Sequence, residues 1–408
     1  MAYRVEQECP QCGAPVELEE TDRLIQCPYC LVKSFIFTPD HFRFVLPRKA
    51  ERERTIYAPY LRFKGAVFFC VDQTIGYRVV DINHAGSSFN GLPVSLGMRP
   101  QALKMRYLSP TEESILLKVE MKPSDILKRA ANLSSGSGPG QVFHRVFIGE
   151  ALSVIYLPLF LKGNRLFDGV LDRPLTELSH GGEEIDAATR LSSRWGLTFI
   201  PTLCPGCGWN LDGERDSVVL FCANCESAWK ASKGKFIRMD FGTDSSKDPD
   251  AVYMPFWKMA GRVQGLEIES FADYVRITNQ PVTAGESRRD KAMYFWVPAF
   301  KIRPKLFLNL ARHFTLAQLE ANPKPIVPAK HRHPVTLPLS EAEQAVKITL
   351  AGSAMNKKEL FPRLPGIRFE PGRSRLIYLP FRETVHDLIQ EKTNAAINKN
   401  ALAFGRSL

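Results

Sequence analysis

The chain has 408 residues and a net charge of +11, and its 44% hydrophobic and 24% charged residues are typical of a folded soluble protein with a sizeable core. Its longest apolar run, Val154 to Leu161, is far shorter than the roughly 20 residues of a membrane-spanning helix, so the sequence predicts no transmembrane segment. Polar residues near the start lead us to expect no secretory leader, and cysteines arranged for metal binding fit a reducing compartment, so the expected location is cytoplasmic.

Eight of the nine cysteines form two identical frames, each reading C-x-x-C, fourteen intervening residues, C-x-x-C. Every cysteine of the second frame lies 195 residues after its counterpart in the first. Four thiolates at this spacing can close a tetrahedral site around one zinc ion, because each C-x-x-C turn aims two sulfurs at the same point. The expected ligands are Cys9, Cys12, Cys27 and Cys30 in the first frame and Cys204, Cys207, Cys222 and Cys225 in the second.

A dithiol redox role is the alternative for these cysteines, since Cys27-Pro-Tyr-Cys30 alone has the form of a glutaredoxin-type motif. A redox pair does not need a second pair fourteen residues away, whereas a four-thiolate site does, so the spacing favours zinc. Four protein sulfurs leave no coordination position for water, which predicts two structural rather than catalytic Zn²⁺ ions. Gly13 and Gly208 follow the first pair of each frame and are expected to allow a turn with positive φ.

A duplication extends beyond the cysteines, because three apolar segments that contain proline recur in the second half at offsets near 200 residues. The period is far too long for a solenoid of stacked repeats. The matched segments are Ile56–Tyr60 with Val252–Trp257, Met98–Pro100 with Ile302–Pro304, and Ile155–Phe160 with Ile377–Phe381.

These modules are predicted to be strands, since they are rich in β-branched and aromatic residues, and a proline within such a run indicates an edge strand, a strand start or a bulge. A hairpin is expected to turn at Gly163-Asn164. Helices are fewer, and are expected from Pro123 to Ala131, from Pro338 to about Leu350, and from Glu383 to about Leu402.

We therefore expect an α+β, mainly β fold built by tandem duplication, in which each half holds a four-cysteine zinc ribbon and an antiparallel β-rich domain with few helices. The sequence leaves open whether the halves form two domains or one domain with pseudo-twofold symmetry. The expected segments are 1–36 for the first ribbon, 37–190 for the first β-rich domain, 198–236 for the second ribbon, 237–383 for the second β-rich domain and 384–408 for a C-terminal helical tail.

The charge distribution argues against nucleic-acid binding by the ribbons, whose net charge is −3 over residues 1–34 and −2 over residues 200–230. Positive charge is concentrated in residues 298–333, which carry +6. This segment is expected either to bind an anionic partner or to form a solvated surface that its prolines keep extended. The candidate anion-binding residues are Lys301, Arg303, Lys305, Arg312, Lys330 and Arg332.

Most aromatic residues of the modules alternate with aliphatic residues, as in half-buried strands, and are expected in the core. Trp257 and Trp296 are singled out as candidate partner-binding aromatics. Lone polar candidates such as Asp168 and His144 have no partner at a diagnostic spacing. No phosphate loop, nucleophile elbow, zinc-protease motif or dinucleotide fingerprint occurs in the sequence, so no catalytic residue is assigned.

The combination of C-x-x-C ribbons with strand modules such as Tyr253-Met254-Pro255-Phe256-Trp257 resembles bacterial proteins that carry TFIIB-type zinc ribbons. This resemblance implies a bacterial, non-enzymatic protein that binds a partner. Our leading hypothesis is a cytoplasmic adaptor whose β modules bind a protein partner or a peripheral complex, with peripheral association to a membrane as one form of it. The alternatives are a nucleic-acid-associated protein that uses residues 298–333, and an enzyme with a site between the two halves.

Overall fold

The computed structural model describes residues 3–49, 55–109, 115–134, 140–178, 185, 196–281, 292–328 and 331–405. Over these residues the fold is mainly β, with antiparallel strand pairs and few helices in each half, which confirms the predicted fold class. The chain forms two compact units. Unit 1 consists of Met1–Lys64, Val80–Leu133 and Glu150–Pro201, and unit 2 consists of Gly65–Val79, Ser134–Gly149 and Thr202–Leu408.

Two antiparallel hairpins of unit 1 carry the first cysteine frame. β1 (Arg4–Glu8) pairs with β2 (Pro15–Glu19), and β3 (Leu24–Gln26) pairs with β4 (Lys33–Phe37). A further strand, β13 (Thr198–Pro201), pairs with the other edge of β4, although it directly precedes the second cysteine frame in the sequence. The sheet around the first ribbon is therefore completed by a strand from about 160 residues further along the chain.

Long strands extend this architecture, with β10 parallel to β5 and antiparallel to β11, and β11 antiparallel to β12. The predicted hairpin is confirmed, since Lys162 pairs with Arg165 and Gly163 in the turn has a φ of +62°. The elements are β5 (Phe42–Val45), β6 (Ile56–Val71), β7 (Thr74–Ala85), α1 (Arg99–Ala102), β8 (Met105–Tyr107), β9 (Ile115–Leu116), α2 (Pro123–Ser134), β10 (Val142–Lys162), β11 (Arg165–Asp168) and β12 (Arg173–Glu177).

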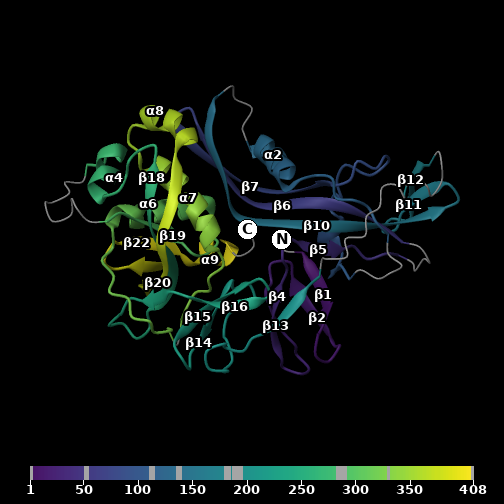
Figure 1. The fold of residues 1–408 in the computed structure, drawn as a ribbon, viewed down its shortest axis with the longest axis horizontal. Coiled ribbons are helices and arrows are strands. Elements are labelled where there is room, and N and C mark those ends of the chain that lie inside the picture. The colour runs from purple at the N-terminus through teal and green to yellow at the C-terminus, as the bar shows by residue number, and fades with distance from the viewer. Residues whose placement is uncertain are drawn as a thin grey trace. The chain divides into compact units, whose positions relative to one another are not determined.

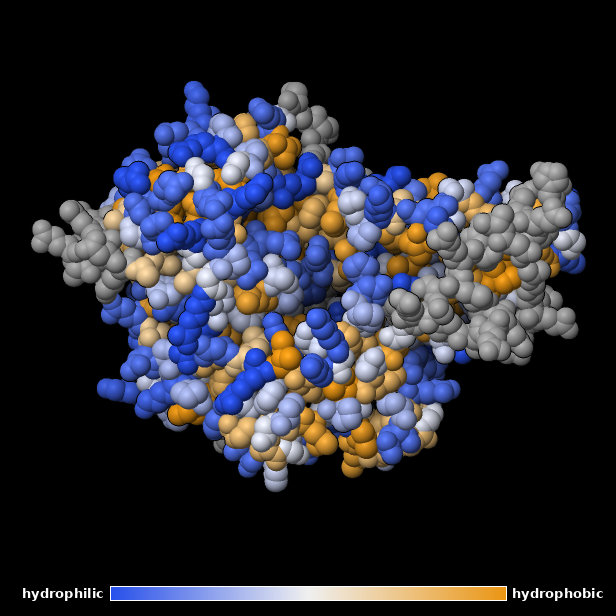
Figure 2. Space-filling view, in the orientation of Figure 1, coloured by the Kyte–Doolittle hydropathy of each residue, from blue (hydrophilic) through white to orange (hydrophobic). Residues whose placement is uncertain are grey.

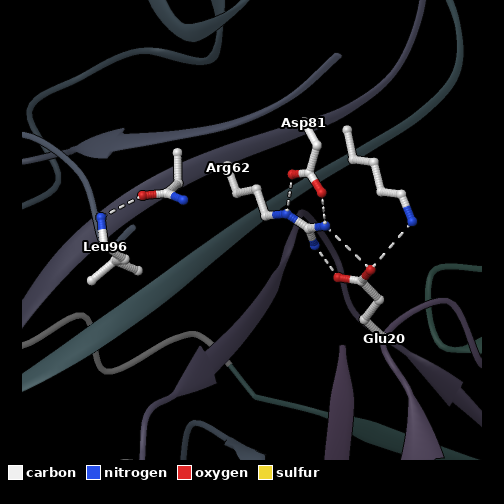
Figure 3. Close-up of polar contacts among 6 residues, drawn as sticks. Glu20, Arg62, Asp81 and Leu96 are labelled. Carbon is white, nitrogen blue, oxygen red and sulfur yellow. Dashed lines mark hydrogen bonds and ion pairs between the residues drawn. The ribbon is translucent and has the colours of Figure 1, made fainter. Parts of the chain in front are cut away.

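A buried ion network joins the first ribbon to the long strands of unit 1 (Figure 3). Arg62 of β6 donates to the Asp81 carboxylate at 2.7 and 2.8 Å and also to the Glu20 carboxylate, and Lys64 Nζ lies 3.6 Å from Glu20 Oε1. The guanidinium lies over the Tyr3 ring, 3.6 Å from its centroid. Because Arg62, Glu20 and Lys64 are buried, their charges must be compensated by one another rather than by water.

Unit 2 holds the second ribbon and a six-stranded sheet in the order β19-β18-β20-β21-β22, with β17 beside β20. Helices α6 and α7 pack on each other and on β19 (Figure 1). The strands are β14 (Val219–Cys222), β15 (Ser227–Ser232), β16 (Lys235–Met239), β17 (Phe241–Thr243), β18 (Val252–Gln264), β19 (Tyr294–Pro298), β20 (Arg368–Glu383), β21 (Asp387–Gln390) and β22 (Ala395–Asn398). The helices are α4 (Phe271–Thr278), α6 (Pro304–Ala317), α7 (Leu339–Ser353), α8 (Lys357–Leu360), the 3₁₀ helix η1 (Phe361–Gly366) and α9 (Lys399–Gly405).

The strand pairing confirms the tandem duplication. In the first half, β5 runs parallel to β10, which continues antiparallel into β11 and β12. In the second half, β17 runs parallel to β20, which continues antiparallel into β21 and β22. Single positions correspond as well, since Asp168 is the last residue of β11 and Gln390 is the last residue of β21. The Asp168 carboxylate accepts from backbone N–H groups two and three residues later, and the buried Gln390 side chain accepts from the N–H of Thr393, three residues later.

The core of unit 2 includes residues from the first half of the chain. Phe68 and Cys70 of β6 and Val146 and Ile148 of β10 are buried in the same cluster as the side chains of α6, α7 and the β18–β20 pair. The rings of Phe68 and Phe307 lie 6.0 Å apart, and the N–H of Gly149 donates to the Glu341 carboxylate. Unit 2 is therefore built from three separate stretches of the sequence.

The strand prediction is wrong for Met98–Pro100 and Ile302–Pro304, because Pro100 and Pro304 lie in the first turns of helices α1 and α6. The other module prolines lie inside strands: Pro59 in β6, Pro158 in β10, Pro255 in β18 and Pro380 in β20.

Of the expected settings (an edge strand, a strand start or a bulge), the edge strand does not apply to Pro158 or Pro255. β10 has neighbours on both sides, and so has β18. Pro158 of β10 lies where β11 has just ended, and its carbonyl accepts from the N–H of Gly169 at 2.8 Å. In the same way, the Pro59 carbonyl accepts from the N–H of Gly86, directly after β7, and the Pro255 carbonyl accepts from the N–H of Ala299, directly after β19. A proline is tolerated there because its missing N–H faces the end of the neighbouring strand.

The helix predictions are partly confirmed. Helices α2 and α7 lie where the sequence predicts them. The predicted C-terminal helix is wrong over most of its length, because residues 387–390 and 395–398 form β21 and β22. Leu388 and Gln390 are buried while their neighbours are not, which is the two-residue period of a strand. The sequence analysis also missed α4 and α6.

Candidate metal centres and the surfaces around them

The first cysteine frame converges on one point of unit 1. Cys9 and Cys12 lie in the turn between β1 and β2, and Cys27 and Cys30 lie in the turn between β3 and β4. Cys9 Sγ is 3.7 Å from Cys30 Sγ, and Cys12 Sγ is 3.6 Å from Cys27 Sγ. All four sulfurs lie within 4.8 Å of one another, so the predicted set of four is brought together as a group.

The second frame has the same geometry in unit 2. Cys204 Sγ is 3.6 Å from Cys225 Sγ, and Cys207 Sγ is 3.4 Å from Cys222 Sγ. The four sulfurs again lie within 4.8 Å of one another. In both frames the outer cysteines of the sequence approach each other, and so do the inner ones, which is the arrangement of two crossed turns.

These distances fit a four-sulfur metal site. A tetrahedral ion with metal–sulfur bonds of about 2.3 Å separates its sulfurs by about 3.8 Å, close to the observed spacings. A disulfide would require about 2.05 Å between sulfurs, so no pair within either frame is a disulfide. Each frame can therefore hold one metal ion with a closed coordination shell.

The backbone of each turn repeats one conformation. Gly13 N–H donates to the Cys9 carbonyl at 2.9 Å, and Gly208 N–H donates to the Cys204 carbonyl at 2.8 Å. Both glycines have positive φ, which confirms that prediction. The residue after the second pair of each frame is left-handed as well, with φ of +61° at Leu31 and +49° at Glu226. A side chain at these two positions costs about 1–2 kcal/mol of backbone strain.

Replacing Leu31 by glycine is therefore expected to strengthen metal binding by the first centre. Leu31 is 68% exposed, so the change relieves strain and sacrifices little burial. The gain is about 1 kcal/mol, or roughly fivefold in the affinity of the centre for Zn²⁺, measured by chelator competition. Gly13→Ala is the reciprocal control, since nothing lies within 4 Å of the added Cβ and only the φ of +74° opposes it. Equal or weaker binding by Leu31→Gly would contradict the strain argument.

Hydrogen bonds prepare some of the thiols for ionisation. The Asn224 side chain and the N–H of Trp209 lower the pKa of Cys207 to about 6, and the N–H of Cys30 contributes most to lowering the pKa of Cys27 to about 7. Burial raises the pKa of Cys222 to about 12. Four adjacent thiols therefore do not all ionise by themselves near neutral pH, and a cation is needed to compensate the full set of thiolates.

The structure distributes the candidate anion-binding residues over several environments. Arg303 and Lys305 are exposed at the start of α6, whereas Lys301 and Arg312 are partly buried. Arg332 donates to the Asp212 carboxylate at 2.8 Å, so its charge is compensated within the chain. Lys330 lies outside the described residues.

A hollow of about 240 Å³ lies beside the second ribbon, lined in part by Asp212, Glu214, His331, Arg332 and Tyr378. Several of its polar groups are engaged in contacts that attach the ribbon to the loop that contains Arg332. Besides the Arg332–Asp212 pair, the N–H of Val218 donates to the Val335 carbonyl at 2.8 Å. The lining thus serves as a structural connection within unit 2.

Trp257 and Trp296 do not reach the surface, which corrects their choice as partner-binding aromatics. They are 2% and 0% exposed, and Trp257 Nε1 donates to the Leu337 carbonyl at 2.9 Å. They lie on the paired strands β18 and β19, and both side chains belong to the buried core cluster of unit 2. Their strand context could have predicted this burial.

Several exposed apolar side chains lie at the metal-binding turns, where the sequence analysis did not look for them, and others, such as Val385 and Met98, lie elsewhere. Leu203 and Trp209 flank the first pair of the second frame and are 53% and 61% exposed. Tyr29 and Leu31 in the first ribbon are 69% and 68% exposed. Apolar surface interrupts the hydrophilic surface over β14 and β15 (Figure 2). The sequence did contain a signal for the exposure of Trp209, because this residue directly follows the turn residue Gly208 and lies outside any run of alternating apolar and polar residues.

His144 of β10 is a partly buried residue of unit 2, and its buried Nε2 has no hydrogen-bond partner among the described residues. Burial lowers its pKa to about 4, and the nearby charge of Lys347 acts in the same direction. As the pH falls, the histidine is therefore protonated in the unfolded chain, where its pKa is near 6.5, before it is protonated in the folded protein. Stability from this group is complete above pH 6.5 and is lost as the pH falls toward 4.

We expect the free energy of unfolding of unit 2 to fall by about 2 kcal/mol between pH 7.5 and pH 5 because of His144. Urea unfolding followed by tryptophan fluorescence measures this, since Trp257 and Trp296 lie in the core of unit 2. His144→Leu removes the titrating group and should flatten the dependence by that amount. The same pH dependence in the variant would show that other groups are responsible.

Among the described helices, none has the length and apolar character that crossing a membrane requires. Comparison of the sequence with models of known families, with curated proteins and with solved structures finds no match.

Proposed function

We propose that this chain is a non-enzymatic adaptor whose two structural zinc ions shape ribbons that bind a protein partner. The observation that carries the proposal is the pair Leu203 and Trp209, two large apolar side chains that flank a metal-binding turn and are more than half exposed. Zinc suits the donor set, because four thiolates at tetrahedral spacing are its usual structural site. No step of chemistry is assigned to the ions, since the cysteines fill the coordination shell.

The turn supports recognition because it holds the side chains in place before binding. Trp209 follows Gly208, whose N–H is bonded to the Cys204 carbonyl, and the Trp209 carbonyl accepts from the N–H of Cys204 at 2.7 Å. An aromatic side chain on such a fixed backbone loses little conformational entropy on binding. Tryptophan is also the residue most enriched among those that dominate protein–protein affinity.

A protein partner is favoured over nucleic acid by the charges. Both ribbons are acidic: Glu6, Glu8, Glu17 and Glu19 are exposed on β1 and β2 of the first ribbon, and residues 200–230 of the second, which include Leu203 and Trp209, carry a net charge of −2. Such a surface repels phosphate. The basic segment offers exposed Arg303 and Lys305, but Arg332 is paired with Asp212. These observations support a contact on the ribbons rather than on the basic segment.

The proposal predicts that Trp209→Ala reduces recovery of the natural partner at least tenfold. The full chain, with and without the substitution, is used to purify partners from extracts of its own host, with mass spectrometry to identify them. The expected loss follows from a contact worth 2 kcal/mol or more, the usual scale for a dominant tryptophan. Met355→Ala is the matched control, because Met355 is 64% exposed in unit 2 but distant in sequence from both ribbons.

Two outcomes would overturn the proposal. The first is equal recovery of the partner by wild type and Trp209→Ala. The second is a nanomolar, salt-resistant complex with DNA or RNA that is abolished by charge reversal at Arg303 and Lys305, which would favour the nucleic-acid alternative.

A further inference from the structure

The second metal centre has a hydrogen-bonded support outside its ligands. Trp229 Nε1 donates to Ser227 Oγ at 2.8 Å, and Ser227 Oγ lies 3.0 Å from Cys225 Sγ and 3.8 Å from Cys204 Sγ. Because Ser227 Oγ already accepts the indole proton, its own hydroxyl proton is free to be donated to sulfur. A metal-bound thiolate carries no proton, so the bond to Cys225 must run from the Ser227 hydroxyl to the sulfur.

This support is buried. Ser227 is 2% exposed and Trp229 is 8% exposed. The indole ring also lies close to the metal-binding turn, since a Cβ at Gly206 would meet the Trp229 ring at 3.5 Å and Cys204 Sγ at 3.7 Å. The ring therefore shields one side of the sulfur cluster from water and from chelators, and the hydroxyl holds Cys225 in place.

The first centre is built without this support. At the positions 195 residues earlier, Val32 stands where Ser227 would be and Ser34 where Trp229 would be. The valine has no hydrogen-bonding group, and it is 40% exposed. Tyr29, 69% exposed, likewise stands in place of Asn224, the residue whose side chain hydrogen bonds to Cys207. The two frames thus share their ligands but differ in what surrounds them.

We propose that the two centres are unequal, with a first centre that exchanges its metal readily and a second centre that retains it, and that Ser227 is the residue that positions the retained site. The inference rests on the proposed zinc content. Outer hydrogen bonds to metal ligands are typically worth 10- to 100-fold in affinity, which sets the expected difference. The first ribbon then responds to the metal supply, while the second remains folded.

The experiment uses the full chain loaded with two zinc ions and a colorimetric chelator in excess. Release is expected in two phases whose rates differ at least tenfold. Cysteines that become free are trapped with a maleimide at each time point and identified by peptide mass spectrometry, with the first frame expected to react in the fast phase. Ser227→Ala should accelerate the slow phase 10- to 100-fold and leave the fast phase unchanged, and Ser227→Thr, which keeps the hydroxyl, should restore it.

Two further variants keep the test decisive. Trp229→Phe preserves a buried ring but removes the N–H that orients Ser227, so it should accelerate the slow phase even if Ser227→Ala folds poorly. Val32→Ala changes the corresponding position of the first ribbon and should alter neither phase. With ¹¹³Cd²⁺ in place of zinc, NMR should give two resonances, of which Ser227→Ala moves only one.

A protein that holds two zinc ions but releases them in a single phase would overturn this inference and leave the proposed adaptor role intact. So would a slow phase that Ser227→Ala and Trp229→Phe do not change. A chain that binds no metal at all would instead refute the proposed function itself.

Discussion

Replacing Cys222 by serine is expected to lower the zinc content from two ions per chain to one and to unfold the second ribbon. Cys222 is fully buried at the end of β14, and its loss leaves three thiolates that cannot close a tetrahedral site. Structural zinc contributes about 10–16 kcal/mol to the folding of small zinc-dependent modules, so this is the largest effect that we expect from a single substitution.

Elemental analysis of protein purified without chelator measures the metal, and Trp229 fluorescence reports on the ribbon, because the indole is buried beside the cluster. Cys70→Ser is the matched control: Cys70 is a buried cysteine of β6 outside both frames, so its substitution should leave two zinc ions bound. Two zinc ions in Cys222→Ser, or fewer than two in the wild type, would contradict the expected content.

The second large effect is expected from Glu20→Gln in the buried ion network. The substitution keeps the shape of the side chain but removes the negative charge that Arg62 and Lys64 share, leaving two buried cations with Asp81 alone. Removing one partner of a buried ion pair usually costs about 3–5 kcal/mol, because the remaining charge has neither water nor a counter-ion. Unit 1 should lose stability by this amount.

Hydrogen exchange of peptides from β1 and β6, read by mass spectrometry, measures this loss, and exchange through global opening of unit 1 should accelerate roughly a hundredfold or more. Glu177→Gln provides the comparison within the same unit. The Arg165–Glu177 pair is more than half exposed, so breaking it should cost less than about 1 kcal/mol. Equal effects of the two substitutions would mean that the buried network does not stabilise the fold.

The sequence predicted both four-cysteine clusters, because their geometry depends on local spacing. A C-x-x-C turn places its sulfurs through three peptide units, and the glycines after Cys12 and Cys207 identify the turn conformation. The hairpin at Gly163 and the helix that begins at Pro123 could be predicted for the same reason. Helix α4 could have been predicted too, since Ser270 and Asp273 form a capping box at its start.

The features that were missed depend on residues far apart in the chain. Whether a strand with neighbours on both sides can contain a proline depends on where the neighbouring strand ends, and Pro158 of β10 illustrates this because β11 ends at Asp168. Trp257 and Trp209 are the same residue type, but Trp257 is buried and hydrogen bonds to the Leu337 carbonyl, 80 residues later, whereas Trp209 is exposed to solvent. Neither the strand lengths nor those distant contacts could be read from the sequence alone.

The chain segments that make up unit 2 also determine when its fold can be completed during synthesis on the ribosome. Unit 1 has all of its residues once Pro201 has left the ribosome, whereas unit 2 combines residues 65–79 and 134–149 with a core that extends to Leu402. Until then, Phe68 and Ile148 belong to strand segments that lack the apolar surface they will finally cover. Unpaired apolar strands of this kind are sites of misassembly and of chaperone binding. The nascent chain is therefore most vulnerable to aggregation while its second half is being translated.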